Sequence, residues 1–270
     1  MSGRPLLTDY LIRTEPYYRP VGDEAALFAA AYAARLPMIL KGPTGCGKTR
    51  FLEHMSWRLR RPLVTIACHE DMSAPDLVGR WLLDAGGTVW HDGPLTRAVR
   101  FGAICYLDEV VEARSDTLVA IHPLTDARRM LPLERSGEVV PAHPDFLLVV
   151  SYNPGYQALQ KDLKESTKQR FGALAFTYPA PDLEAEIVAH EAGVDASCAT
   201  RLVQVGAASR ALVAEGLTEG ASTRMLIHAG RLIAGGIGFA PACALAVATP
   251  LTDDPALRDA LAAAIAAQVP

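Results

Sequence analysis

The feature that most constrains the fold of this chain is a glycine-rich segment, residues 42–49, which reads GPTGCGKT. It fits the pattern G-x-x-x-x-G-K-[ST] at every fixed position. The apolar residues 37–41 before it predict a short buried strand, and residues 50–59 after it predict a helix with one apolar face. A strand, a glycine loop and a helix N-terminus together surround a phosphate with backbone N–H groups. The sequence therefore predicts a phosphate site here, rather than a glycine-rich turn that matches by chance.

The residues of this loop have distinct expected roles. The glycines permit positive φ angles and a close approach of the backbone to a ligand. Lys48 is expected to reach the β- and γ-phosphates, and the Thr49 hydroxyl is expected to bind Mg²⁺. The predicted nucleotide contacts are Gly42, Pro43, Thr44, Gly45, Cys46, Gly47, Lys48 and Thr49.

A second anchor is the apolar run at residues 103–107, which ends in Asp108 and Glu109. In P-loop ATPases a strand of this kind lies beside the P-loop strand, its first acid holds the Mg²⁺ shell, and an adjacent acid activates water. By itself an apolar run followed by two acids is common, and it is also compatible with a helix N-terminus. Downstream of a P-loop, it predicts Asp108 as a metal ligand and Glu109 as the group that activates water.

A third polar position follows the apolar residues 146–151. Asn153 comes directly after this predicted strand. Open α/β sheets place their ligand contacts at the carboxyl ends of parallel strands. Asn153 is therefore expected to orient the attacking water, although asparagine before proline is also an ordinary turn residue.

The order of the predicted elements indicates the fold class. Strand candidates alternate with helical stretches, which predicts a parallel, doubly wound α/β sheet of five strands. Two hairpins interrupt this pattern, at residues 81–91 and at about 130–140. After a Pro-Ala-Pro segment at 179–181 every element is predicted to be helical. We therefore predict an α/β nucleotide-binding domain at 1–180 and an all-helical lid domain at 181–270. The strand candidates are residues 37–41, 63–67, 103–107, 146–151 and 174–178.

Composition excludes several classes of protein. The chain has 270 residues and a formal net charge of −4, which argues against a general nucleic-acid or membrane-surface binder. Its 5 cysteines include no C-x-x-C pair, so a disulfide framework or a zinc site is not expected. We see neither a signal-peptide core at the N-terminus nor an apolar run of about eighteen residues. These observations favour a cytoplasmic protein without a membrane-spanning helix.

The motifs also carry a family resemblance. The segments GPTGCGKT, ICYLDE, VVSYNPG and KQRFG, followed by a helical region with STR, resemble the AAA+ ATPases. The two predicted hairpins are similar to the insertions of the MoxR group. The segments GGTVWHDGPLTRAVRFGAICYLDEVVEAR and VVSYNPGYQALQKDLKESTKQRF are similar to the CbbQ/NorQ subgroup, and the CbbQ branch is the nearer of the two. The resemblance covers most of residues 20–180 and is looser in the helical region.

This resemblance implies further roles. Residues 42–49 would be the Walker A loop, and Asp108 and Glu109 the Walker B pair. Asn153 would be sensor 1, and Arg170 an arginine finger that reaches the γ-phosphate of a neighbouring subunit. Arg224 would be the sensor 2 arginine, serving either its own or an adjacent site. From the residues alone, Arg170 is only a cation at a helix end, where it suits the helix dipole.

The resemblance further implies ATP and Mg²⁺ as cofactors, a homo-hexameric ring, and a partner with a von Willebrand factor A domain of the CbbO type. A CbbQ-type protein is expected to act on Rubisco and release inhibitory sugar phosphates. A NorQ-type protein is instead expected to serve the maturation of nitric oxide reductase. A nucleic-acid-stimulated motor is a further alternative, which would need basic hairpins. The first hairpin segment carries Asp84, His91 and Asp92 and no lysine, and the second carries Arg128, Arg129 and Arg135 against Glu134 and Glu138, which is thin support. We therefore expect a protein client, and neither a nucleic acid nor a membrane as partner.

Overall fold

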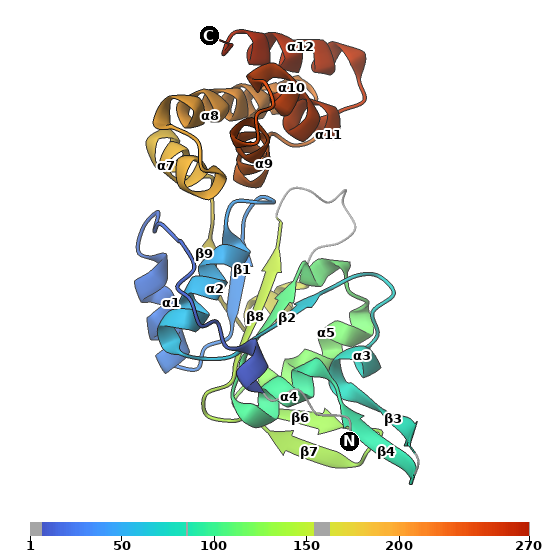
Figure 1. Cartoon of the computed structure of the whole chain (residues 1–270). Helices are drawn as coiled ribbons and strands as arrows, with labels where there is room; N and C mark the ends of the chain where they lie inside the picture. Colours follow the sequence, from blue (N-terminus) through green and yellow to red (C-terminus); the bar gives the residue numbers. More distant parts are fainter. Residues whose placement is uncertain (1–6, 85, 154–162, 270) are drawn as a thin grey trace. The chain divides into compact units, whose positions relative to one another are not determined.

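The computed structural model describes residues 7–84, 86–153 and 163–269. The chain divides into two compact units. The first consists of Met1–Gly42 and Lys48–Phe176, and the second of Pro43–Gly47 and Thr177–Pro270. In Figure 1 the first unit contains the central sheet and the second contains helices α7 to α12.

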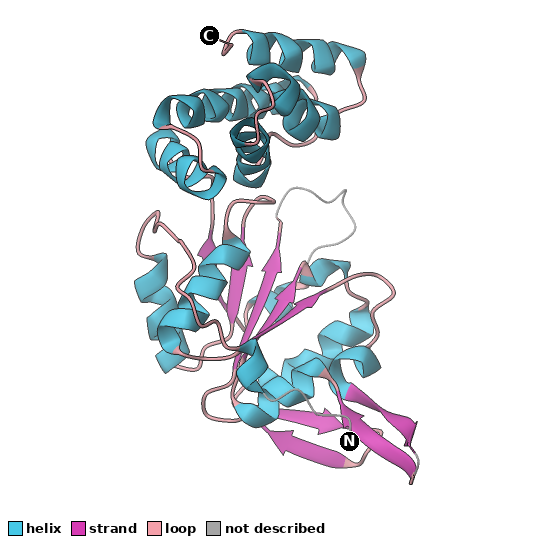
Figure 2. Ribbon diagram, viewed as in Figure 1, coloured by secondary structure: helices cyan, strands magenta, loops and turns pink. Residues whose placement is uncertain are grey.

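The first unit is built on a 5-stranded sheet in the order β2-β5-β8-β1-β9. All neighbouring strands are parallel, which confirms the predicted α/β class. The central strand β8 has all six residues buried, as expected where helices cover both faces of a sheet. Figure 2 shows this helical cover on the two sides of the sheet. The strands are β1 (Met38–Lys41), β2 (Leu63–Ala67), β5 (Ile104–Asp108), β8 (Leu147–Tyr152) and β9 (Gly172–Ala175).

The last strand differs from its prediction. The apolar pattern placed it at residues 174–178, but β9 begins at Gly172 and ends at Ala175. Pairing with β1 sets these limits, because Met38 lies opposite Gly172 and Lys41 lies opposite Ala175. A side chain at 172 would meet a neighbour, since a Cβ there would lie 2.8 Å from Leu36 Cδ2. Glycine is uninformative in an apolar pattern, so the pattern missed the start of the strand.

Helices of the first unit fill the space beside the sheet with large side chains. Phe28 of α1 and Phe51 of α2 are fully buried and meet edge to face with ring centroids 5.4 Å apart. Residues 115–124 divide into α5 and a 3₁₀ turn, because Pro123 has no N–H to continue α-helical bonding. The helical segments are η1 (Leu7–Tyr10), α1 (Glu24–Ala33), α2 (Lys48–Leu59), α3 (Ala74–Val78), α4 (Pro94–Phe101), η2 (Val110–Glu112), α5 (Ser115–Ile121), η3 (His122–Leu124) and α6 (Glu165–Lys168).

Both predicted hairpins are present, and side chains brace them against each other. Arg100 of α4 donates to Asp92 at 2.9 Å in the first hairpin and to Glu138 at 2.6 Å in the second. The Trp81 indole N–H also donates to the Arg135 carbonyl at 3.0 Å. Two insertions that are separate in the sequence therefore form one braced element. The first hairpin pairs β3 (Gly79–Asp84) with β4 (Gly87–Asp92), and the second pairs β6 (Met130–Leu133) with β7 (Glu138–Pro141).

The second unit is helical and has its own apolar core, which includes Leu202, Leu226 and Leu261. Within this core the buried Glu184 accepts hydrogen bonds from Arg210, at 2.7 and 2.8 Å, and from the Thr223 hydroxyl at 2.6 Å. This network ties α7, α8 and α9 together. The elements are α7 (Pro181–Ala192), α8 (Ala196–Ala211), η4 (Leu212–Glu215), α9 (Thr223–Ala234), α10 (Phe239–Cys243), the π-helical turn η5 (Ala244–Ala248), α11 (Thr249–Leu251) and α12 (Pro255–Ala266).

Helix caps account for several limits in the second unit. Helix α8 begins at Ala196, because the Asp195 carboxylate accepts from the Cys198 N–H at 2.9 Å and caps the helix. Ser222 and Asp254 cap α9 and α12, and Gly193 ends α7 in the left-handed conformation. Among the described residues, no helix is long and apolar enough to cross a bilayer.

Candidate active site

The glycine loop connects β1 to α2, as the sequence predicts. Gly42, Gly45 and Gly47 have φ angles of 155°, 68° and 101°, which side chains rarely tolerate. At Gly42 the constraint is also steric, because a Cβ would lie 2.4 Å from the Phe176 carbonyl oxygen. The first turn of α2 contains no acidic residue. The loop and this helix N-terminus are therefore suited to hold an anion.

Lys48 and Asn153 come together at the carboxyl ends of adjacent strands. The side chain of Lys48 is buried, and its ammonium group donates to the Gly42 carbonyl and to Asn153 Oδ1, each at 2.7 Å. The register of β1 with β8 explains the contact, since Lys41 lies opposite Tyr152. A bound phosphate would accept the hydrogen bonds that the ammonium group donates to these two oxygens in the structure. The geometry thus joins the predicted phosphate-binding lysine to the predicted sensor residue.

Asp108 lies at the end of β5, where two buried hydroxyl groups hold its carboxylate. Tyr106 donates to Asp108 Oδ1 at 2.6 Å, and Ser151 donates to the same oxygen at 2.5 Å. Both donor residues are fully buried. Oδ2 receives no side-chain hydrogen bond from the described residues, so it is available to a metal ion or to water bound to one.

Glu109 follows in an unusual backbone conformation. Its φ and ψ are 55° and 48°, in the left-handed region, which costs a non-glycine residue roughly 1–3 kcal/mol. Its N–H donates to Ser151 Oγ at 3.1 Å, and the next two residues, Val110 and Val111, are buried. These contacts hold the strained backbone in place. The side chain of Glu109 is exposed, as a group that contacts a water nucleophile needs to be.

The groups around the two acids stay neutral. Burial raises the pKa of Tyr106, and the nearby Asp108 carboxylate raises it further. Burial, together with Asp108 and Glu109, raises the pKa of the Cys68 thiol to about 12. Cys68 is therefore a neutral thiol and not a thiolate nucleophile.

Thr49 and Asp108 suit a magnesium ion that arrives with a nucleotide. The described residues contain no group of three or more His, Cys, Asp or Glu side chains that could hold a metal on their own. Mg²⁺ is usually bound by one or two protein groups together with phosphate oxygens and water. The Thr49 hydroxyl also hydrogen-bonds with the Tyr106 hydroxyl that donates to Asp108. The donor set fits a nucleotide-bound Mg²⁺ rather than a metal caged by protein groups.

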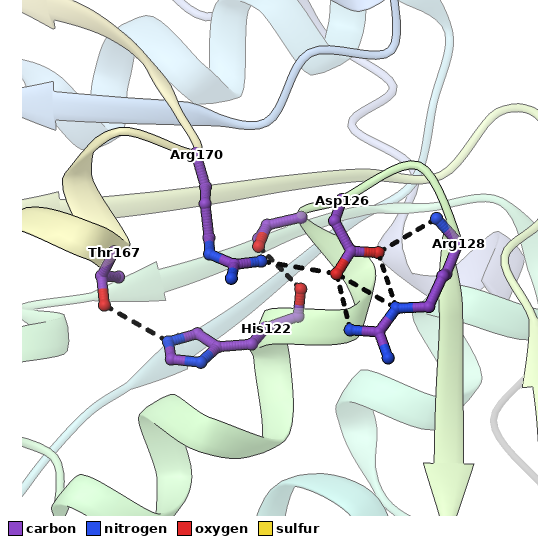
Figure 3. A network of polar contacts seen from close by, with 6 residues as sticks. His122, Asp126, Arg128, Thr167 and Arg170 are labelled. Carbon is purple, nitrogen blue, oxygen red and sulfur yellow. Dashed lines mark hydrogen bonds and ion pairs between the residues drawn. The ribbon is translucent and has the colours of Figure 1, made fainter.

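Arg170 lies in a separate network at the surface, drawn in Figure 3. Its guanidinium contacts Asp126 Oδ2 at 3.4 Å. The same carboxylate accepts from the Arg128 side chain at 2.6 to 3.1 Å. Nearby, His122 Nε2 lies 3.3 Å from Thr167 Oγ1, which links η3 to α6. The role of Arg170 at a neighbouring subunit stays a prediction.

Arg224 belongs to the second unit. It is exposed in the first turn of α9, directly after the Ser222 and Thr223 positions. Its role as sensor 2 stays a prediction as well.

The sequence interpretation missed three residues that contact the predicted site groups: Tyr106, Ser151 and Asp126. A signal existed for the first two, because residues two apart on a strand face the same side. Tyr106 shares a face with Asp108 on that basis. No local pattern links Asp126 to Arg170, which lies far along the chain.

Comparison with known families agrees with this geometry. Residues 37–171 match the AAA domain (dynein-related subfamily), and residues 184–268 match the CbbQ/NirQ/NorQ C-terminal domain. The chain is an AAA+ ATPase of the CbbQ/NirQ/NorQ family. Membership makes the predicted fold and the ATPase class firm for this chain.

Relatives span nearly the whole length. Protein CbbQ of Hydrogenophilus thermoluteolus is 65% identical over 259 residues, 96% of this chain and 97% of that protein. Protein NorQ of Paracoccus denitrificans (strain Pd 1222) is 57% identical, over 93% of this chain and 94% of that protein. The denitrification regulatory protein NirQ of Pseudomonas aeruginosa is 58% identical, over 91% and 95%.

Solved structures share the fold at low identity. A putative ATPase from Cytophaga hutchinsonii has a TM-score of 0.51 at 18% identity, over 90% of this chain and 80% of that chain. NtrX from Brucella abortus, solved in complex with ADP, has a TM-score of 0.52 at 16% identity, over 79% and 50%. At these identities the likeness concerns the fold alone.

Proposed function

We propose that this ATPase is a CbbQ-type remodelling motor that works with a CbbO-type partner and releases inhibitory sugar phosphates from Rubisco. The observation that carries the proposal is the 65% identity to a protein CbbQ over 96% of the chain. The second candidate is a NorQ-like maturation ATPase for nitric oxide reductase, which the 57% identity to a protein NorQ supports. Both candidates use ATP hydrolysis to change the state of another protein.

The proposed chemistry is in-line attack of water on the γ-phosphate of ATP. Glu109 activates the water and Asn153 orients it, while Lys48 and the backbone of residues 42–47 hold the phosphates. Mg²⁺, held through Thr49 and Asp108, supplies positive charge to the phosphate oxygens. The contacts between Lys48 and Asn153 and the exposed side chain of Glu109 support these assignments.

The remaining elements of the proposal concern assembly. Arg170 completes the site of a neighbour in a cytoplasmic homo-hexamer, and Arg224 stabilises the phosphates of its own or an adjacent site. The partner carries a von Willebrand factor A domain. We place the boundary between nucleotide-binding and lid domains at residues 180 and 181.

The braced hairpins support a protein client rather than a nucleic acid. Leu83 and Trp81 lie on the same face of β3 and are 87% and 47% exposed. Exposed apolar groups that cluster on one element are typical of protein contacts. Each hairpin also carries more acids than arginines, since Asp84 and Asp92 outnumber Arg80 in the first, and Glu134 and Glu138 outnumber Arg135 in the second. Neither hairpin therefore has the basic excess that binds a phosphate backbone.

A pull-down tests the client. The Glu109→Gln variant should bind ATP without hydrolysing it, and so retain partners that ATP hydrolysis would release. Incubated with ATP in an extract of the source cells, it should co-purify with a von Willebrand-type protein and Rubisco. Lys48→Ala, which is expected to bind ATP poorly, is the control. Recovery of a nitric oxide reductase subunit would shift the assignment to the NorQ type, and recovery of neither client would contradict the proposal.

A further inference from the structure

The ends of β5 and β8 are joined by one side chain that serves both acids. Ser151 Oγ donates its proton to Asp108 Oδ1 and accepts the proton of the Glu109 N–H. Its hydrogen-bonding capacity is therefore divided between the proposed metal ligand and the residue that activates water. A fully buried hydroxyl cannot exchange such partners for bulk water.

Tyr106 adds a second constraint on the same carboxylate. Its hydroxyl also donates to Asp108 Oδ1, so two protons converge on one oxygen. Hydrogen bonds to a charged acceptor are shorter and stronger than those between neutral groups. Both hydroxyls therefore engage Oδ1, which restrains the rotation of the carboxylate.

The position of Ser151 in the sheet links the acids to the phosphate-binding lysine. Ser151 lies opposite Leu40 of β1, and two residues later Asn153 accepts from Lys48. The end of β8 therefore contacts the acids through Ser151 and the lysine through Asn153. A shift at this strand end would displace both sets of groups.

We propose that Ser151 and Tyr106 are positioning residues that orient Asp108 toward the metal, and that Ser151 also holds Glu109 in its left-handed conformation. The inference rests on the proposed roles of Asp108 and Glu109. It predicts different consequences for the two hydroxyls. Loss of the Tyr106 hydroxyl affects metal binding, whereas loss of the Ser151 hydroxyl affects both metal binding and the activation of water.

The test compares Tyr106→Phe, Ser151→Ala and Ser151→Thr, which keeps the hydroxyl. Ser56→Ala is the matched control, because Ser56 is equally buried in the same unit but donates to the Arg61 carbonyl, away from the acids. Mn²⁺ binding to the ADP-loaded full-length protein is followed by electron paramagnetic resonance. Steady-state hydrolysis is measured over a range of Mg²⁺ and ATP concentrations.

Removing a group that hydrogen-bonds to a metal ligand typically changes metal affinity or activity by about 10- to 100-fold. We expect Tyr106→Phe and Ser151→Ala to weaken Mn²⁺ binding by about 10-fold. Ser151→Ala should also lower kcat by about 10-fold at saturating Mg²⁺, with the KM for ATP nearly unchanged. Tyr106→Phe should recover its kcat at high Mg²⁺, and Ser151→Thr should resemble the wild type in both measurements.

Two outcomes would overturn the inference. One is wild-type Mn²⁺ binding in Ser151→Ala and Tyr106→Phe; the other is a change in melting temperature alone, like that of Ser56→Ala. Asp108→Asn separates this failure from a failure of the proposed function. If Asp108→Asn binds Mn²⁺ normally, the proposed metal site itself is wrong. If Asp108→Asn loses Mn²⁺ while the hydroxyl variants keep it, only the positioning roles are wrong.

Discussion

Two carboxylates, Asp108 and Asp126, are each held by two side chains, but they lie in opposite environments. Asp108 receives its hydrogen bonds from the fully buried Tyr106 and Ser151. Asp126 lies at the surface and is held by the partly exposed guanidinium groups of Arg128 and Arg170. Water cannot replace the first set of contacts, whereas it readily replaces and screens the second.

This difference indicates how the two halves of the proposed site behave. The groups that a subunit supplies to its own nucleotide are fixed by the interior of the sheet. Among the described residues, the Arg170 guanidinium contacts Asp126 at 3.4 Å, a carboxylate that Arg128 engages more closely. Such an arginine can exchange Asp126 for another anion at small cost. A group that serves a neighbouring phosphate needs this freedom.

The largest effect is expected from a substitution in the exposed half of the proposed site. Arg170→Ala should lower kcat by about 10³-fold or more, since arginine fingers contribute about 10³–10⁵. Nucleotide binding, followed by the rise in melting temperature with ADP, should persist. Mixing Arg170→Ala with Lys48→Ala subunits should restore part of the hydrolysis, because each supplies what the other lacks. Mixed rings that are no more active than the separate variants would contradict action in trans.

The next largest effect is expected from a substitution in the half of the proposed site that the interior of the sheet holds in place. Glu109→Gln should lower the rate of phosphate release by about 10²-fold or more, because a positioned general base contributes about 10²–10⁴. ATP binding should remain. Glu53→Gln is the control, since this partly exposed acid of α2 pairs with Arg50 and is not among the proposed site residues. A wild-type rate in Glu109→Gln would remove Glu109 from the proposed role.

A smaller effect is expected at Asp126. Asp126→Asn should lower kcat by about 3- to 10-fold, because Arg170 loses the contact that holds it in place before it engages a phosphate. Glu165→Gln removes another exposed acid near Arg170, one that pairs with Lys168, and should leave kcat unchanged. An increase in kcat in Asp126→Asn would instead mean that Asp126 restrains Arg170.

The pH dependence sharpens this prediction. Hydrogen bonds from Arg128 lower the pKa of Asp126 to about 2. A carboxylate whose pKa is depressed in the folded state keeps its ion pairs above the unfolded pKa of about 3.9 and loses them as the pH falls through about 2. The ratio of wild-type to Asp126→Asn kcat should therefore stay constant between about pH 6 and 9. A ratio that changes within this range would show that another group titrates with Arg170.

The smallest effect concerns the brace between the hairpins, whose exposure is intermediate. Arg100→Ala should lower the free energy of unfolding by about 1 kcal/mol, the upper range for a partly exposed pair, which is a shift in melting temperature of about 2–4 °C. Arg50→Ala removes a more exposed pair and should change stability by less than about 0.5 kcal/mol. Client-free hydrolysis should be unaffected in both. Equal destabilisation by the two variants would show that the brace adds nothing beyond an ordinary surface pair.

Local chemistry made much of this molecule predictable. The glycine loop, the acids after β5 and Asn153 after β8 each follow an apolar run, and parallel strands bring such ends to one edge. The end of the helix before Pro123 and the start of the strand at Gly172 were harder to predict. Hydrogen-bonding geometry and strand pairing, rather than hydrophobicity, set those two limits. The Asp126–Arg170 contact depends on how η3 meets α6, and the sequence carries no periodic signal of that meeting.

The first glycine of the loop has a mechanical consequence. Gly42 lies so close to the Phe176 carbonyl that no side chain would fit between them, and the Phe176 N–H bonds to Lys41 at 2.6 Å. Phe176 also packs on Phe51 of α2, with ring centroids 5.1 Å apart. Where the chain leaves the sheet, at Phe176, it therefore packs against both the glycine loop and the helix that follows this loop. A rearrangement of that loop at Gly42 would therefore act directly on Phe176, the last residue of the first unit.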